Sequence, residues 1–261
     1  MNRDFTKNLL QILALATVFP ATAIASATCT VPEGKGRNIN HAKLFIEDNA
    51  GDGDIGVHGY FDDHGWKELC VFDPSGQLIL QVSPTGRMGD LGIAGVFFES
   101  REPEYAIWDY NALKAAWPEG EYALRAAGSD GELLTGAAHF TTVLPAIPQI
   151  VSPATVPERD EGKIPTVPLA DLKVEWKPVT TSQDGRPINI RAYQVWINKE
   201  NHSDDHGFSR PNFDVHVSAA ATSFVVPAAF FDPFSLYEIE VVAIEESGNQ
   251  TIGGASYFKT E

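Results

Sequence analysis

The stretch SLYEIEVVAIEESGNQTIGGASYFKT, residues 235–260, decides the fold class of this chain. Its apolar side chains alternate with other residues from Tyr237 to Ala243, which is the period of a half-buried β-strand. The sequence ESGNQ then supplies turn chemistry, and a second run of short and β-forming residues ends near Phe258. The stretch predicts two antiparallel strands around a turn, and we expect an all-β fold.

An earlier stretch, EGEYALRAAGSDGELLTGAAHFTT at residues 119–142, repeats this order of features. Tyr122 leads an alternating strand, SDGE is a hairpin signal, and a strand of small residues ends at Phe140. We interpret the two stretches as the closing hairpins of two related immunoglobulin-like or fibronectin-like β-sandwich domains in tandem. The alternative is a coincidence between two generic alternating patterns.

The second half of the chain resembles the fibronectin type III family, over about residues 148–261. LKVEWKPV (172–179) looks like the second strand of that family with Trp176 in the core position, and RAYQVWIN (191–198) is similar to its third strand. Tyr237 matches the tyrosine-corner strand. The resemblance implies a sandwich of two antiparallel sheets and identifies no partner. An insertion around residues 155–190 departs from the family pattern, and the absence of an Arg-Gly-Asp tripeptide leaves integrin adhesion unsupported.

The domain boundary is expected within a proline-rich segment. Six of the 17 prolines lie in residues 145–168, and such a stretch stays extended. We therefore predict an N-terminal β-sandwich at 28–147 and the fibronectin-like domain at 148–261. The first of these regions also resembles segments that precede fibronectin-like domains in exported bacterial proteins. It contains one expected short helix, capped by Asp109 and stopped by Pro118.

Residues 1–27 have the pattern of a secretory signal peptide. Arg3 and Lys7 precede a short apolar run and the small residues ASA, so we expect cleavage after Ala25 or Ala27. The alternative is a buried N-terminal helix. The apolar run is shorter than the ~20 residues that a spanning helix needs. We therefore expect a periplasmic or secreted protein with no integral membrane segment after cleavage.

The two cysteines, Cys29 and Cys70, are expected to form a disulfide, since a lone pair in an exported protein is most simply bridged. The bridge would attach an N-terminal arm to the first domain. The alternative makes Cys29 a lipoprotein cysteine, although Thr28 stands where such signals carry a smaller residue.

The chain is acidic, with a formal net charge of −16 at pH 7. A surface of this sign repels phosphate backbones and anionic membranes. Nucleic acid is therefore not an expected partner, and the partner is expected to be a protein or a glycan.

The stretch IEDNAGDGDIG, residues 46–56, is the first candidate metal site. Calcium binds six to eight oxygens, and clustered carboxylates in a glycine-rich loop supply such ligands. The EF-hand spacing is not met, because Ala50 and Gly59 stand at ligand positions. A β-domain calcium site remains, so for this stretch we expect either no cofactor or calcium. The alternative is an Asx-rich turn between strands. The candidate ligands are Asp48, Asp52 and Asp54, joined by Asp62 or Asp63 from an expected next turn.

The stretch NHSDDHG is the alternative metal site. It carries His202 and His206, with His216 further along the chain, and imidazole with carboxylate suits zinc or copper. Its position at the expected tip of a strand connection favours the simpler interpretation of a polar loop.

The sequence contains no G-x-S-x-G, H-E-x-x-H or glycine-rich phosphate-loop motif. Trp66 and Trp108 are candidate platforms for a sugar or peptide, although aromatic rings in a sandwich are more often core. We therefore expect an exported, non-catalytic binding or scaffold protein with an unidentified partner. The first alternative is a calcium-dependent carbohydrate-binding or accessory protein. The second is a hydrolase whose carboxylates meet only in the folded chain.

Overall fold

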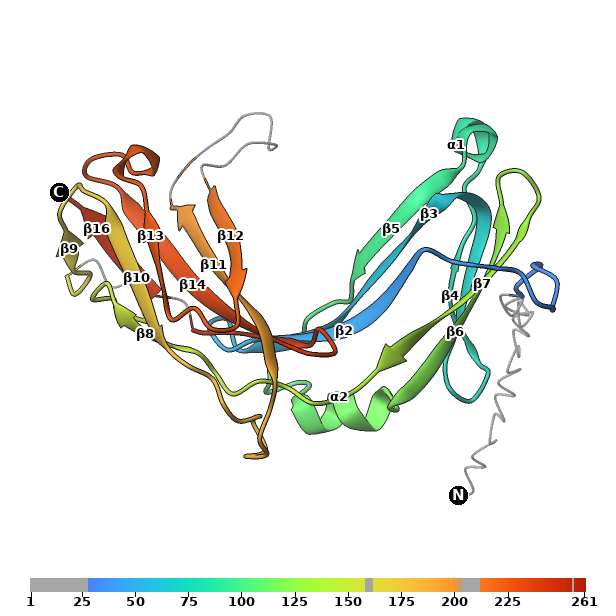
Figure 1. Ribbon diagram of the computed structural model, residues 1–261, viewed down its shortest axis with the longest axis horizontal. Coiled ribbons are helices and arrows are strands. Elements are labelled where there is room, and N and C mark those ends of the chain that lie inside the picture. The colour runs from blue at the N-terminus through green and yellow to red at the C-terminus, as the bar shows by residue number, and fades with distance from the viewer. Residues whose placement is uncertain (1–27, 158–161, 201, 203–211, 255) are drawn as a thin grey trace, which may run out of the picture.

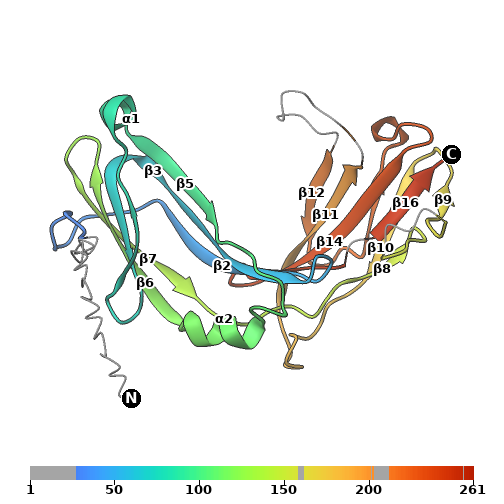
Figure 2. The same ribbon diagram turned by 180° about the vertical axis from the view of Figure 1, so that it is seen from behind.

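The computed structural model describes residues 28–157, 162–200, 202, 212–254 and 256–261. In these residues the chain forms two β-sandwich modules joined end to end, which confirms the predicted all-β tandem fold (Figure 1). The modules are the two arms of a V, and strands from both meet at its base, as the view from behind also shows (Figure 2). The expected signal peptide and His206 lie outside the described residues.

The first module consists of a layer ordered β1-β7-β6-β3-β4 and a second layer in which β3 lies between β2 and β5. Strand β3 belongs to both layers, because the chain changes direction near Gly65, whose φ is 133°. The bounds are β1 (Arg37–Asn38), β2 (His41–Asn49), β3 (Asp54–Phe72), β4 (Leu78–Val82), α1 (Gly86–Leu91), β5 (Ile93–Glu99), α2 (Tyr110–Ala116), β6 (Gly120–Gly128) and β7 (Leu133–Phe140).

Helix α2 is the helix that the sequence predicts. The Asp109 side chain accepts a hydrogen bond from the backbone N–H of Ala112 at 2.9 Å, and Leu113 is buried against the core. The helix ends just before Pro118, which cannot continue it. Helix α1 is an addition to the expected single helix, and none of its residues is buried. No helix in the described part of the chain has the length and apolar character to cross a membrane.

The second module pairs a three-stranded layer, β13-β10-β8, with a layer ordered β9-β16-β14-β11-β12. This is a fibronectin type III-like sandwich. The bounds are β8 (Gln149–Ser152), β9 (Thr166–Val167), β10 (Leu172–Lys177), β11 (Ile190–Lys199), β12 (Asn212–Ser218), β13 (Ser223–Val226), the 3₁₀ turn η1 (Ala228–Phe230), β14 (Leu236–Glu245), β15 (Gln250–Ile252) and β16 (Ser256–Thr260).

The two modules share a connectivity. The order β1-β7-β6-β3-β4 corresponds to β9-β16-β14-β11-β12, and in each case the first pair is parallel and the others are antiparallel. Each also has a buried tyrosine whose hydroxyl bonds the backbone upstream. Tyr122 donates to the Pro118 carbonyl at 3.0 Å, and Tyr237 accepts from the Asp232 N–H at 2.7 Å.

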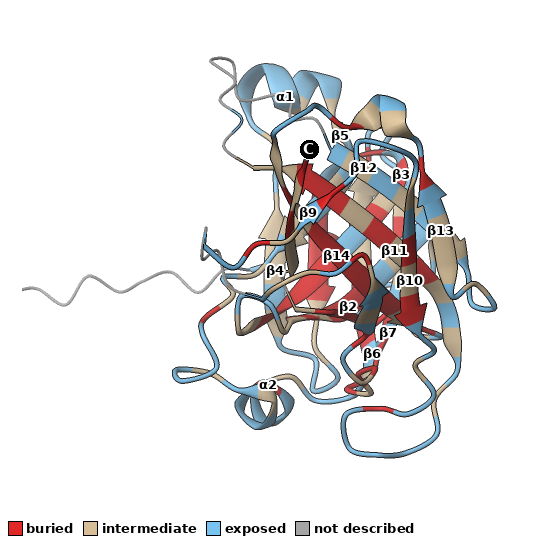
Figure 3. Cartoon of the chain, turned by 90° about the vertical axis from the view of Figure 1, so that its left-hand side faces the viewer, coloured by how far each residue is buried: buried red, intermediate tan, exposed pale blue. Residues whose placement is uncertain are grey.

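Each module has its own apolar core. Figure 3 looks onto the second module, and its central strand β14 is largely buried and drawn red. In the first module Tyr122 lies edge-on to Phe140 with ring centroids 5.5 Å apart. In the second module Tyr237 stacks on Phe258 at 5.6 Å, and Trp176 is buried beside Tyr193. These aromatic residues supply much of the apolar area that stabilises the two sandwiches.

A disulfide joins Cys29 to Cys70 on β3, as the sequence predicts. Glu68, two residues before Cys70, accepts hydrogen bonds from the backbone and hydroxyl of Thr30. The bridge and these bonds together attach the N-terminal arm to the first module.

The two modules are joined by a continuous sheet. Strand β15 of the second module pairs in parallel with the end of β2 in the first. Asn249 is buried at this joint, where its Oδ1 accepts from the Ile46 N–H at 2.8 Å and its Nδ2 donates to the carbonyls of Thr141 and Val143 at 2.9 Å. Because the two modules share backbone hydrogen bonds at this joint, a sheet face of the first module continues into a sheet face of the second.

Candidate functional site

The strands β5, β3, β2, β15, β14, β11 and β12 are hydrogen-bonded in that order across both modules. One face of this sheet packs on the two cores, through residues such as Ile46, Val57 and Val241. The opposite face, here called the inner face, looks into the V of Figure 1. Strand alternation therefore places every second residue of seven strands on one surface.

A pocket of about 350 Å³ lies on the inner face at the joint. Aromatic rings, carboxylates and amides from both modules line it. Phe97 is the most open of the rings, with 62% of its surface exposed, and Trp196 is half-buried. The lining residues are Phe45, Glu47, His58, Phe97 and Glu99 from the first module, and Gln194, Trp196, Asn212, Asp214, Val242, Gln250 and Ile252 from the second.

Three titratable side chains meet at the first-module side of this pocket. The His58 Nε2 lies 2.9 Å from Glu102 Oε1 and 4.0 Å from Glu47 Oε1. One ligand-type atom from each residue lies within 4.8 Å of the other two. His58 is only 4% exposed, and its ring lies between those of Phe45 and Phe97, at centroid distances of 5.1 and 5.9 Å. We call Glu47, His58 and Glu102 the inner-face triad.

The backbone explains why these three side chains meet. Glu47 on β2 is the cross-strand partner of Gly56 on β3, and His58 is two residues further along the same face. Glu102 follows β5, and its side chain lies over Gly56, where a Cβ atom would be only 2.6 Å from its Cγ. The segment before Glu102 is fixed by hydrogen bonds in both directions between Ser100 and Val57. Gly56 thus leaves the space that brings Glu102 to His58.

The carboxylates around the triad are crowded and desolvated. Burial raises the pKa of Glu47, and His58 and Gln250 oppose that effect. Burial, with the charges of Glu102 and Asp52, raises the pKa of Asp54 to about 6. Asp54 Oδ1 is buried and has no hydrogen-bond partner among the described residues. Burial opposes the charged imidazole of His58, but the bond to Glu102 and the charge of Glu47 outweigh it and raise the histidine pKa. The carboxylates around His58 therefore stabilise a positive charge at the position of its ring.

The inner face of the second module carries a buried carboxyl group. Glu240 on β14 is opposite Trp196 and only 5% exposed, and its Oε2 has no hydrogen-bond partner among the described residues. Burial, with the charges of Glu238 and Asp52, raises its pKa to about 8. Glu240 therefore holds a proton at neutral pH. The negative charge that disfavours an anionic ligand comes from the carboxylates that line the pocket, Glu47, Glu99 and Asp214.

The predicted acidic loop is a turn between β2 and β3. Asn49 Oδ1 accepts from the N–H groups of Gly51 and Asp52 at 3.0 and 3.1 Å, which is an Asx-turn. Asp48 is buried at the joint, where the Tyr105 hydroxyl and the Gln183 amide donate to it. Asp52 lies in the turn, and Asp54 lies on the inner-face side of β3. The structure does not bring these three carboxylates together as one ligand group.

The expected next turn, which would have supplied Asp62 or Asp63, is absent because both residues lie within β3. Asp63 instead accepts hydrogen bonds from Arg37, at 2.6 Å, and from the Asn40 N–H, at 2.9 Å. Of the alternative metal ligands, His202 and His216 are exposed, and His206 lies outside the described residues.

The two tryptophans proposed as platforms do not provide one. Trp66 is 0% exposed and belongs to the first core, and Trp108 packs against the same core with its indole Nε1 buried. The tryptophan on the inner face is Trp196, which lies in the stretch RAYQVWIN that resembles the third fibronectin strand. The register of β11 decides this, because Val195 and Ile197 take the core positions.

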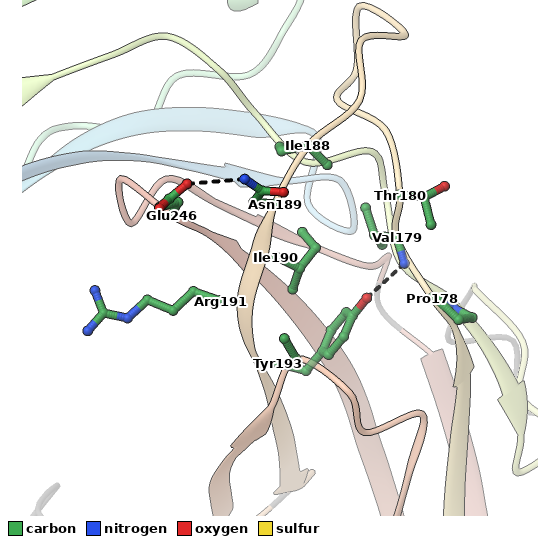
Figure 4. A pocket seen from close by; sticks show the side chains of 10 residues that line it. Pro178, Val179, Thr180, Ile188, Asn189, Ile190, Arg191, Tyr193 and Glu246 are labelled. Carbon is green, nitrogen blue, oxygen red and sulfur yellow. Dashed lines mark hydrogen bonds between the residues drawn. The ribbon is translucent and has the colours of Figure 1, made fainter.

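Two other features are less suited to be the site. Cys29, Glu68 and Cys70 form the second metal-type group among the described residues, but their two sulfurs are joined in the disulfide. A larger hollow of about 690 Å³ lies at the edge of the second module (Figure 4). Two pairs of its lining residues hydrogen-bond each other: Asn189 donates to Glu246 at 3.3 Å, and the Val179 N–H donates to the Tyr193 hydroxyl at 2.7 Å. The inner-face pocket differs in that residues of both modules line it and the triad lies beside it.

Sequence reasoning missed all three triad residues as site residues, although Glu47 lies within the quoted stretch 46–56. A signal for two of them was present. If the residues on either side of the acidic turn are predicted to pair as a hairpin, strand alternation places His58 and Glu47 on the same face. The position of Glu102 depends on the path of the chain after β5, and no local pattern predicts it.

No protein-family model and no curated protein matches this chain. Among solved structures it is similar to the FN1–FN3 domains of chicken CNTN1, with 11% identity, a TM-score of 0.33, and coverage of 87% of this chain and 65% of that chain. It is also similar to fibronectin(III)-like modules of Clostridium thermocellum CbhA (11% identity, TM-score 0.30, 85% and 91% coverage). A third match is a two-domain fibronectin type III segment of chicken tenascin (11%, 0.30, 84% and 99%). At these scores the fold assignment rests on the strand order and not on the matches.

Proposed function

We propose that this chain is an exported, non-catalytic binding protein that holds a non-anionic oligosaccharide in the inner-face pocket at the joint. The observation that carries the proposal is the lining of that pocket, which combines aromatic rings with planar polar side chains from both modules. Aromatic faces pack against the C–H faces of sugar rings, and carboxylates and amides bond hydroxyl groups. The N-terminal sequence pattern and the disulfide support export.

The polar groups favour a sugar over an apolar peptide. Gln194 and Asp214 lie beside Trp196 and hydrogen-bond each other at 2.7 Å, which fixes both side chains before a ligand arrives. Fixed polar groups reduce the entropy that a ligand must overcome on binding. The acidic surroundings disfavour sulfated or uronic sugars.

The test is a screen of neutral, basic and anionic oligosaccharides, followed by titration of the best ligand into wild type, Trp196→Ala and Phe97→Ala. We expect a neutral or basic ligand whose affinity falls about 5- to 30-fold in each variant, because an aromatic contact is worth about 1–2 kcal/mol. Phe234→Ala is the matched control, since this ring is 88% exposed at the far end of the second module. Thermal midpoints verify that each variant is folded.

Binding that survives both inner-face substitutions, or a preference for anionic sugars, would overturn the assignment of this pocket. Conversion of the bound oligosaccharide to shorter products would overturn the non-catalytic part of the proposal and favour the hydrolase alternative.

A further inference from the structure

We propose that the inner-face triad, Glu47, His58 and Glu102, is a site for a divalent transition-metal ion, with Zn²⁺ as its best-suited occupant. The proposal does not depend on the oligosaccharide, because metal binding is measurable with no sugar present. Glu47 is the one triad residue within the acidic stretch 46–56 that the sequence singled out, and none of the three ligands belongs to the Asp48, Asp52 and Asp54 set.

The distances suit such an ion. Zinc binds imidazole nitrogen at about 2.0–2.1 Å and carboxylate oxygen at about 2.0–2.2 Å, so tetrahedral ligands lie about 3.3 Å from one another. The His58 Nε2 distances of 2.9 Å to Glu102 and 4.0 Å to Glu47 are on either side of that value. The first distance is about 0.4 Å shorter and the second about 0.7 Å longer than that value, so only small movements of the two carboxylates separate the observed arrangement from a ligand set.

The donor set distinguishes the metal. Calcium binds oxygen ligands, whereas a histidine nitrogen with two carboxylates is a zinc-type set. Three protein ligands leave a fourth tetrahedral position for water or a bound hydroxyl group. Because Glu47 and His58 also line the pocket, that position borders the proposed ligand site.

Neighbouring residues hold the triad side chains in place without a metal ion. Gln250 on β15 donates its side-chain N–H to Glu47 Oε2, so a residue of the second module orients a ligand of the first. Phe45 and Phe97 hold the His58 ring from two sides. The buried, unpaired Asp54 Oδ1 lies on the same face of β3 and adds negative charge beside the triad.

The experiment is calorimetric titration of ZnCl₂, and in parallel CaCl₂, into the purified full chain without a histidine tag. We expect one Zn²⁺ per chain, bound far more tightly than Ca²⁺. His58→Gln, Glu47→Gln and Glu102→Gln are each expected to weaken Zn²⁺ binding by about 100-fold or more, beyond the 10–100-fold that loss of a supporting residue costs.

Two further variants separate metal binding from general electrostatics. Gly56→Ala removes no ligand but displaces the Glu102 side chain, so we expect Zn²⁺ binding to weaken by at least about tenfold. Asp62→Asn is the matched control: Asp62 lies on the same face of β3 as His58 but belongs to neither the triad nor the pocket, so binding is expected to stay within about threefold of wild type. Because His58 is buried, its variant is paired with thermal midpoints in chelator, and the two glutamate variants carry the test if it does not fold.

The proposal is overturned if the Kd for Zn²⁺ is not below about 0.1 mM. It is also overturned if Zn²⁺ binding persists in the triad variants and disappears in His202→Ala/His206→Ala, which would assign the ion to the NHSDDHG loop. Equal weakening by Asp62→Asn and Glu102→Gln would overturn it too, since that result indicates nonspecific attraction to an acidic face.

Discussion

At the scale of single residues, Asn249 shows how the modules are joined. It is 1% exposed, and its amide makes hydrogen bonds to three backbone groups of the first module and the linker, those of Ile46, Thr141 and Val143. An amide is the side chain that supplies an acceptor and two donors at one point. In the sequence this residue belongs only to the turn ESGNQ, and partners about 100 to 200 residues away leave no local trace.

Replacement of Asn249 by alanine is expected to lower the free energy of unfolding by about 2–4 kcal/mol. The substitution leaves a buried N–H and two carbonyl groups without their partner, and each such group costs roughly 1–3 kcal/mol when it cannot be satisfied otherwise. Urea denaturation measures the change. The matched control is the exposed Asn38→Ala, for which we expect less than about 0.5 kcal/mol; a similar loss in both variants would contradict the role of Asn249.

The disulfide is expected to contribute about 4 kcal/mol of stability on the chain-entropy model, because it closes a loop between cysteines 41 positions apart. The double variant Cys29→Ser/Cys70→Ser tests this by urea denaturation. A reductant should lower the stability of wild type to that of the variant and leave the variant unchanged. A loss below about 1 kcal/mol would show that the N-terminal arm contributes little to the folded state.

At the scale of elements, β14 combines a core face with an inner face that carries carboxyl groups. Tyr237, Ile239 and Val241 pack on the second core, whereas Glu238 and Glu240 alternate with them on the other side. The alternation is visible in the sequence, and so are the Asp109 cap of α2 and the turn after β2. The 19-residue strand β3 is not, because its segment DDHG has the composition of a turn but continues the strand.

The raised pKa of Glu240 makes stability depend on pH. The folded-state pKa is about 8 and the ordinary value is 4.5, so between these values the folded chain holds a proton that the unfolded chain has lost. The Glu240 contribution to the free energy of unfolding therefore falls as pH rises from about 4.5 to 8, by at most about 1.4 kcal/mol per pH unit, and is constant above that range.

Glu240→Gln is expected to remove this fall, so the variant gains stability over wild type progressively from pH 5 to pH 8. Urea denaturation at several pH values measures the difference. The exposed Glu33→Gln should run parallel to wild type across the same range. A Glu240→Gln curve that is also parallel to wild type would contradict the desolvation of this carboxyl group.

At the scale of the whole molecule, the sequence predicts the two sandwiches but not the surface that they build together. The module type follows from alternating strands, turns and the tyrosine positions, all of which are local patterns. The inner face depends on the parallel pairing of β15 with β2, and the triad depends on Gly56 and on the path of the chain to Glu102. These are contacts across long sequence separations, which explains why the predicted acidic turn was adjacent to the candidate site but did not contain it.

The central claim is that the two modules share one continuous sheet, because the pocket and the orientation of Glu47 by Gln250 both require it. The most direct measurement is the hydrogen-exchange rate of the Ile46 amide by NMR, since this N–H donates across the joint to Asn249 Oδ1 at 2.8 Å. We predict protection comparable to that of the core amides of β14. Rapid exchange of Ile46, in a protein whose β14 amides remain protected, would show that the joint opens and would contradict the shared inner face.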